Sequence, residues 1–207
     1  MPYKNKIKIY QKDTYYHLYA RGLDKMSLFK TPKDYRYFEL LLEKYLTYGY
    51  IDKRKYGNYE VLVTINSASE YIDLNCYTLM PNHFHLLCRN KTDTGITILM
   101  QRVLSVYSKY FNKKYKRRGT ILEGSYRAVL IETERQLVHV SRYIHLNPLK
   151  DGLVKRTSDY AFSSYKNYLM NDSSKKWLKL DPTISSATEY ENIDKYLGDR
   201  GVNGLSV

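Results

Sequence analysis

Hydrophobic and polar positions along the chain predict a mixed order of strands and helices. Short apolar runs indicate strands, whereas Tyr37, Leu40, Leu41 and Tyr45 recur at the spacing of a helix that begins at Pro32. The segments assigned in this way are strands over residues 13–20, 72–80, 83–89 and 126–131, and helices over residues 32–48, 94–114 and 133–147. The order β-α-β-β-α-β, followed by a further C-terminal helix, predicts an α+β fold: a ferredoxin-like antiparallel sheet with helices on one face.

The last of these helices carries signals at both ends. Thr133 is followed three residues later by Gln136, which fits a capping box at the helix N-terminus. Pro148 and Gly152 disfavour continuation of the helix, so we expect it to end after Asn147.

The 207 residues suit one domain. We assign residues 1–170 to that domain, with residues 49–70 as a possible insertion and residues 171–207 as an acidic C-terminal tail. No apolar run is long enough to span a membrane, and the N-terminus lacks a signal-peptide pattern. Cys76 and Cys88 are too few for a disulfide framework. These features predict a protein of the reducing cytoplasm with no membrane partner.

The charge balance points to a polyanionic partner. The chain has 34 Lys and Arg against 21 Asp and Glu, a net charge of +13. Residues 102–122 contain no acid, and Tyr107, Tyr110 and Tyr115 lie among their basic residues. Cations and exposed rings suit single-stranded nucleic acid, although a solvated basic helix face has the same composition. The candidates for contact with a nucleic-acid backbone are Lys109, Lys113, Lys114, Lys116, Arg117, Arg118 and, in the following strand, Arg127.

Two small groups of residues suggest chemistry. His83 and His85 flank Phe84 in a predicted strand that follows a Pro81-Asn82 turn, so both imidazoles share one face and two ligands converge. Half-buried histidines bonded only to backbone are the alternative. Tyr143 and Asn147 lie four residues apart and share one face of the last helix, which by itself means little.

Two longer motifs resemble a known family. The run YTLMPNHFHLLCRN at residues 77–90 and the run RYIHLNPLKDGLV at residues 142–154 resemble the REP-associated tyrosine transposases. These proteins are relatives of the single-tyrosine insertion-sequence transposases in the HUH endonuclease superfamily. Supporting similarity comes from YHLYARG at residues 16–22 and DYAFSSYKNY at residues 159–168.

The resemblance implies a site and a reaction. His83 and His85 would bind a divalent cation, Mg²⁺ or Mn²⁺, with Asn147 as a third ligand, and Tyr143 would be the nucleophile on a C-terminal catalytic helix. The implied activity nicks and rejoins hairpin-associated single-stranded DNA through a 5′-phosphotyrosine intermediate. The implied partner is single-stranded or hairpin DNA in the prokaryotic cytosol or nucleoid, bound by a monomer or a homodimer.

Two other functions fit the same residues. The first is a domesticated nucleic-acid-binding protein that keeps the fold but does not cleave DNA. The second is a metal-dependent nuclease that uses a metal-bound water, with Tyr143 only positioning the phosphate. Glu123 also departs from the family pattern, in which many relatives carry glutamine. For His17 and His145 we expect structural roles.

Overall fold

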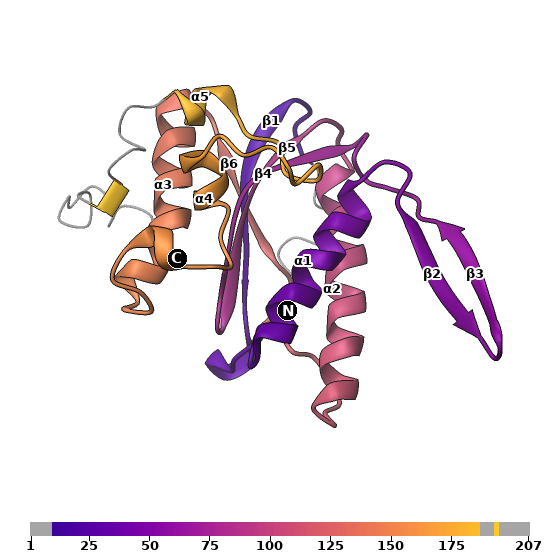
Figure 1. Cartoon of the computed structure of the whole chain (residues 1–207). Coiled ribbons are helices and arrows are strands. Elements are labelled where there is room, and N and C mark those ends of the chain that lie inside the picture. The colour runs from indigo at the N-terminus through magenta and orange to yellow at the C-terminus, as the bar shows by residue number, and fades with distance from the viewer. Residues whose placement is uncertain (1–9, 187–192, 195–207) are drawn as a thin grey trace, which may run out of the picture.

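The computed structural model describes residues 10–186 and 193–194, and its centre is a four-stranded antiparallel sheet (Figure 1). The strand order is β4-β5-β1-β6. The sheet and its first two helices confirm the predicted α+β, ferredoxin-like order. The strands are β1 (Thr14–Arg21), β4 (Ile72–Met80), β5 (His83–Asn90) and β6 (Arg127–Ile131), and the helices are α1 (Pro32–Leu46) and α2 (Gly95–Lys114).

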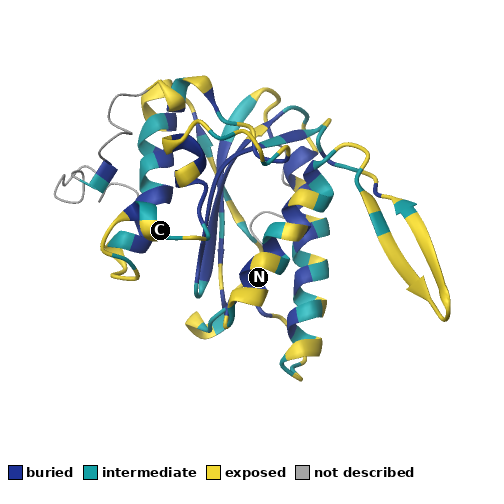
Figure 2. Ribbon diagram, in the orientation of Figure 1, coloured by how far each residue is buried: buried dark blue, intermediate teal, exposed yellow. Residues whose placement is uncertain are grey.

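The sheet is covered on both faces. Helices α1 and α2 lie on one side, and α3 (Glu134–Lys150) lies on the other (Figure 1). Phe38 of α1 and Tyr107 of α2 pack in one core with Phe84 of the sheet, while Ile144 of α3 packs in a second core with Leu87. Strands β4 and β5 are therefore buried along nearly their whole length, which explains their almost continuous apolar sequence (Figure 2).

A two-residue turn joins β4 to β5. Met80 pairs with His83 in the ladder, so Pro81 and Asn82 form the turn, as the sequence predicts. The backbone N–H of Gly22 donates a hydrogen bond to the Asn82 carbonyl at 2.7 Å, which ties this turn to the end of β1. His83 and His85 consequently lie at one end of the central strand pair.

The segment from residue 49 to residue 70 contains a separate hairpin. Strands β2 (Ile51–Tyr56) and β3 (Tyr59–Thr64) pair only with each other and project from the body of the protein (Figure 1). Both faces of this hairpin are largely exposed (Figure 2). The sequence predicts this segment only as a possible insertion.

The N-cap at Thr133 is confirmed, but the reciprocal bond of the expected capping box is replaced by one from Glu132 N–H to Gln136 Oε1 at 2.9 Å, and the expected end of the helix is wrong. The Thr133 hydroxyl accepts a hydrogen bond from the Gln136 N–H at 3.1 Å. The helix continues through Pro148 to Lys150. It ends where Gly152 adopts a φ of 69°, with hydrogen bonds from Gly152 N–H to Leu149 O and from Leu153 N–H to Pro148 O. This is a Schellman motif, and the left-handed glycine ends the helix where the proline does not.

The chain after α3 returns to the sheet domain. It contains 3-10 turns and short helices, and Trp177 and Leu178 join the core formed with α1 and α2. Leu178 makes a parallel bridge to Leu74, so part of the expected tail packs on β4. The expected acidic tail beyond residue 186 lies largely outside the described residues. The elements are η1 (Leu23–Lys25), η2 (Thr157–Asp159), α4 (Tyr165–Leu169) and α5 (Pro182–Ser185).

None of the helices in the described part of the chain is long and apolar enough to cross a membrane.

Candidate active site

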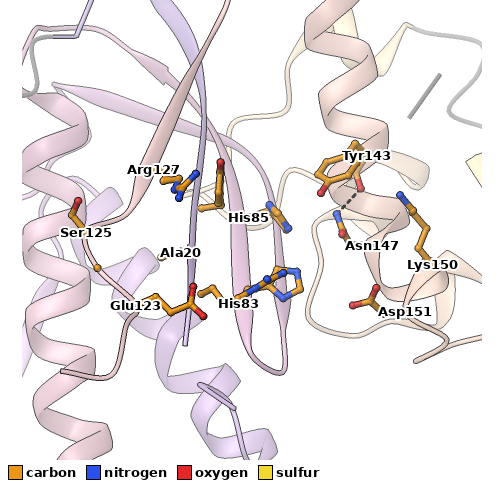
Figure 3. Close-up of a pocket in the computed structure, with 13 residues that line it drawn as sticks. Ala20, His83, His85, Glu123, Ser125, Arg127, Tyr143, Asn147, Lys150 and Asp151 are labelled. Atoms are coloured by element: carbon orange, nitrogen blue, oxygen red, sulfur yellow. Dashed lines mark hydrogen bonds between the residues drawn. The ribbon is translucent and has the colours of Figure 1, made fainter. Parts of the chain in front are cut away.

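A pocket of about 510 Å³ opens where β1, β5 and α3 meet (Figure 3). Four of the residues expected in the site line it together: His83 and His85 from β5, and Tyr143 and Asn147 from α3. These side chains are far apart in the sequence, and the sheet brings them to one place. The remaining lining residues are Tyr19, Ala20, Arg21, Glu123, Gly124, Ser125, Arg127, Lys150 and Asp151.

The two histidines of β5 are buried beside each other. Their ring centroids lie 4.9 Å apart with an angle of 86° between the ring planes. His83 Nδ1 lies 2.7 Å from Asn82 Oδ1, and because a carboxamide oxygen only accepts, Nδ1 donates this bond. The other ring nitrogen of His83, Nε2, is then left with its lone pair.

His85 makes its contact with a third histidine. Its Nδ1 lies 2.8 Å from Nε2 of His17 in β1. Its own Nε2 is buried and has no hydrogen-bond partner among the described residues. Burial lowers the pKa of His83 and of His17 to about 4, and it lowers the pKa of His85 well below its usual value. All three rings are therefore neutral at pH 7, the form in which imidazole binds metal ions.

Helix α3 presents Tyr143 to the histidines. The Tyr143 ring centroid lies 5.5 Å from that of His85 and 5.9 Å from that of His17, and both pairs are edge to face. Asn147 stands one turn later, and its Nδ2 donates a hydrogen bond to the Tyr143 carbonyl at 2.7 Å (Figure 3). The amide oxygen of Asn147 remains an acceptor.

Burial raises the pKa of the Tyr143 phenol, although a hydrogen bond from Asn147 opposes this change. The phenol therefore keeps its proton at neutral pH. An attack by this oxygen requires surroundings that stabilise negative charge.

Charged side chains surround the phenol. Lys150 Nζ lies 5.4 Å from the Tyr143 ring centroid. Arg21 and Arg127 line the same pocket, together with the acids Glu123 and Asp151. Three cations against two carboxylates favour an anionic ligand such as a phosphate.

The residues of the pocket fit a divalent cation. Two neutral imidazoles and one amide oxygen form a donor set of three, and the buried His85 Nε2, which has no hydrogen-bond partner among the described residues, is a nitrogen that a cation could bind. Across residues 10–186 and 193–194, no group of three or more His, Cys, Asp or Glu is arranged to hold a metal ion. A cation bound in this pocket would therefore need the Asn147 amide oxygen or the substrate as its further ligands.

The sequence model of the family described as "Transposase IS200 like" matches residues 11–147, which is more than half of the chain. The chain belongs to this family. The match begins before β1 and ends at Asn147, so it contains both histidines of β5 and Tyr143. It confirms the resemblance drawn from the two motifs and places the chain among transposases, which are DNA-processing enzymes.

A solved structure shows the same fold. It is that of a REP-associated tyrosine transposase bound to a REP hairpin, with a TM-score of 0.54 and 16% sequence identity. The similarity covers 86% of this chain and 90% of that chain. No curated protein matches the chain.

The basic residues of α2 do not line the pocket of this transposase. Arg127, the candidate from the following strand, does line it. Lys109, Lys113, Lys116 and Arg118 are exposed at the end of α2 and in the loop that follows. The loop leads to the pocket, because the Glu123 N–H donates a hydrogen bond to the Arg21 carbonyl at 3.1 Å.

Lys114 differs from the other bases of this group. Its Nζ lies 2.6 Å from Oδ1 of the buried Asp34, and its side chain is 28% exposed. The hydroxyl groups of Tyr110 and Tyr115 donate to the same carboxylate at 2.9 and 2.6 Å. This cluster joins α1 to α2, so Lys114 has a structural role.

Two further histidines are accounted for. His145 is buried, with Nε2 2.7 Å from the Ser164 hydroxyl, which also accepts a hydrogen bond from Tyr77 N–H. This agrees with the structural role expected for it. His17 is also buried, but its contact with His85 makes it part of the site, which sequence reasoning missed along with Tyr19 and Lys150.

Proposed function

We propose that this transposase is a single-strand DNA endonuclease and strand transferase that nicks and rejoins hairpin-associated DNA through a 5′-phosphotyrosine intermediate. The observation that carries the proposal is the contact between Tyr143 and the ring of His85 in one pocket with cationic walls. A nucleophile beside a pair of neutral imidazoles can act on the same phosphate that the imidazole site orients.

Each step has a defined bond change. The Tyr143 oxygen forms a bond to phosphorus, and the bond from phosphorus to the 3′-oxygen of the preceding nucleotide breaks. The phenolic proton is lost, and the leaving 3′-oxygen gains a proton to become a hydroxyl. Because the phosphotyrosine ester keeps the energy of the phosphodiester, a 3′-hydroxyl can attack it and join two strands without a nucleotide cofactor.

His83, His85 and Asn147 would hold the Mg²⁺ or Mn²⁺ ion in this proposal. When bound, such an ion neutralises charge on phosphate oxygens and polarises phosphorus. Lys150 and Arg127 add positive charge from the protein itself and would orient a phosphate against Tyr143. Asn82 would orient the His83 ring through the hydrogen bond that it accepts from Nδ1.

The DNA partner is proposed from chemistry and from the solved relative. That relative is a transposase bound to a REP hairpin. In this chain, the backbone of a hairpin or single strand would run along exposed bases toward the pocket. These bases are Lys109, Lys113, Lys116 and Arg118, and Arg117 would contribute from the same loop.

DNA of this kind occurs in the cytoplasm, where we place the protein. We further propose residues 1–170 as the transposase domain, with the β2–β3 hairpin as an insertion and with Trp177 and Leu178 of the following segment packed into its core.

A covalent-trapping experiment tests the proposed activity. Wild-type protein with Mn²⁺ and a labelled hairpin oligonucleotide should give a DNA-linked band on a denaturing gel, and Tyr143→Phe should not. Tyr48→Phe, which changes an exposed tyrosine just after α1, is the control and should leave the band unchanged. Cleavage without a linked band would indicate a metal-water nuclease, and binding without cleavage would indicate a domesticated binder.

A further inference from the structure

We propose that His17 is a positioning residue that accepts the Nδ1 proton of His85 and so leaves His85 Nε2 with its lone pair directed at the pocket. This inference about His17 depends on the proposed function at one point, the identity of the ligand as a divalent cation.

The sheet register brings His17 and His85 into contact. In the β1–β5 ladder Tyr19 pairs with His85, and His17 pairs with Leu87. His17 and His85 are thus diagonal neighbours on one face of the sheet, an arrangement in which long side chains reach each other. Their ring centroids are 5.0 Å apart and their planes are 25° from parallel, so the two rings meet edge to edge in nearly one plane, as a hydrogen bond between ring nitrogens requires.

One proton lies between the two rings. His17 Nε2 and His85 Nδ1 are 2.8 Å apart, so one nitrogen donates and the other accepts. If His17 donates, the neutral His85 carries its own proton on Nε2, which becomes a buried donor without an acceptor and cannot bind a cation. If His85 donates, Nε2 keeps a lone pair. Only the second arrangement makes His85 a ligand.

The neighbouring histidine shows the same arrangement. His83 donates from Nδ1 to the Asn82 side-chain oxygen, which leaves its Nε2 with a lone pair. Asn82 and His17 are different residues from different parts of the chain, yet each supplies an acceptor to the Nδ1 of one imidazole. With both acceptors in place, the two rings offer the same nitrogen to the pocket, as a shared cation requires.

Packing alone does not require a histidine at position 17. The side chain is 4% exposed and its ring contacts Tyr19 and Tyr143 edge-on or at a tilt, contacts that a phenyl ring would also make. A phenyl ring provides no acceptor for His85. The substitution His17→Phe therefore separates the hydrogen bond from the packing, and His17→Gln restores an acceptor at about the position of Nε2.

The tautomer can be measured directly in metal-free protein. Nitrogen-15 shifts of histidine-labelled protein distinguish a proton on Nδ1 from a proton on Nε2. We expect the wild type and His17→Gln to hold the His85 proton on Nδ1, and His17→Phe to move it to Nε2. The wild-type spectrum alone tests the proposal even where a variant does not fold: a proton on Nε2 of His85 overturns it.

Cation affinity is the second readout. Mn²⁺ titration followed by electron paramagnetic resonance should show a dissociation constant about 10- to 100-fold weaker for His17→Phe, the usual effect of losing an outer-shell partner. His17→Gln should remain within about 3-fold of wild type, and so should the control His139→Phe, which changes a half-buried α3 histidine outside the pocket lining. Unchanged affinity in a folded His17→Phe protein overturns the proposal.

The two proposals fail in different ways. A wild-type protein that forms no DNA adduct but shows the His17-dependent tautomer contradicts the proposed function alone. A protein that forms the adduct while His17→Phe keeps the wild-type tautomer and Mn²⁺ affinity contradicts the role of His17 alone.

Discussion

The ring of Tyr143 meets the ring of His85 edge to face, with 5.5 Å between the centroids and 80° between the planes. Tyr143 comes from α3 and His85 from the central strand β5, so the contact exists only because α3 covers the sheet face that carries the histidine pair. The phenol is held beside a possible cation site before any DNA binds. Little rearrangement of the protein is then needed to bring the nucleophile to a bound phosphate.

Removing one imidazole of the histidine pair should lower the metal-dependent rate of adduct formation while leaving the affinity for DNA nearly unchanged. For His83→Ala we expect the rate of adduct formation at saturating Mn²⁺ to fall roughly 100-fold, about 2.7 kcal/mol of barrier. Affinity for the hairpin oligonucleotide should stay within about 3-fold, measured by fluorescence anisotropy. Equal rates for wild type and variant, or a wild-type rate unaffected by EDTA, would show that a metal ion at this site does not take part in the reaction.

Lys150 should assist the phenol electrostatically. Because its ammonium lies 5.4 Å from the Tyr143 ring centroid, Lys150→Met should slow single-turnover adduct formation roughly 10-fold, and Lys150→Arg should recover most of that loss. Lys155→Met, at an exposed position outside the pocket lining, is the matched control. If both methionine variants have the same rate, Lys150 does not act on the phenol.

The exposed bases after α2 should determine the salt dependence of binding. Converting Lys113, Lys116 and Arg118 to glutamine should reduce the slope of log affinity against log salt by about 2, at roughly 0.7 for each contact with a single strand. The same change in net charge made at Lys53, Arg54 and Lys55 of the β2–β3 hairpin is the control. Equal slopes for the two triple variants would show that general charge, and not this surface, governs binding.

Asp34 should contribute to stability in a pH-dependent way. Burial alone would raise its pKa, but hydrogen bonds from Lys114, Tyr115 and Thr31 outweigh that effect and hold the pKa well below its usual value. A carboxylate whose pKa is lower in the folded state stabilises the fold above its unfolded pKa, and this contribution is lost as the pH falls below that value. Asp34→Asn should therefore cost roughly 3 kcal/mol at pH 7 in urea unfolding.

The same measurement at lower pH checks the cause of that loss. The difference between wild type and Asp34→Asn should be constant from pH 7 down to about 5 and shrink below about 4. Tyr37→Phe, which leaves the carboxylate cluster intact, provides the control. A difference that stays constant to pH 2 would mean that the carboxylate charge is not what stabilises the α1–α2 contact.

Local signals in the sequence were sufficient for most elements. Strands β4 and β5, the turn at Pro81-Asn82 and the N-cap at Thr133 depend on residues close in the chain, and each is present in the structure. The predicted end of α3 at Asn147 is wrong because the prediction assumes that Pro148 stops the helix. Here Gly152 in a left-handed conformation supplies the stop one turn later.

The sequence does not reveal which distant residues the fold brings into contact. His17 looks like an ordinary residue of a buried strand, and its contact with His85 follows from the pairing of β1 with β5. Lys114 likewise looks like any other base of its run until Asp34 is placed against it. Identical residue types thus have different roles according to which distant partner the fold supplies.

The most direct test of Tyr143 as the nucleophile is to identify the residue that is covalently linked to the DNA. Two tyrosines, Tyr143 and Tyr19, line the pocket, so a linked band alone does not distinguish them. Trapped complexes should be digested with protease and nuclease, and the modified peptide sequenced by mass spectrometry. We expect a nucleotide phosphate on Tyr143 alone, with Tyr19→Phe still forming the adduct. A phosphate on Tyr19, or on any residue outside the pocket, would contradict it.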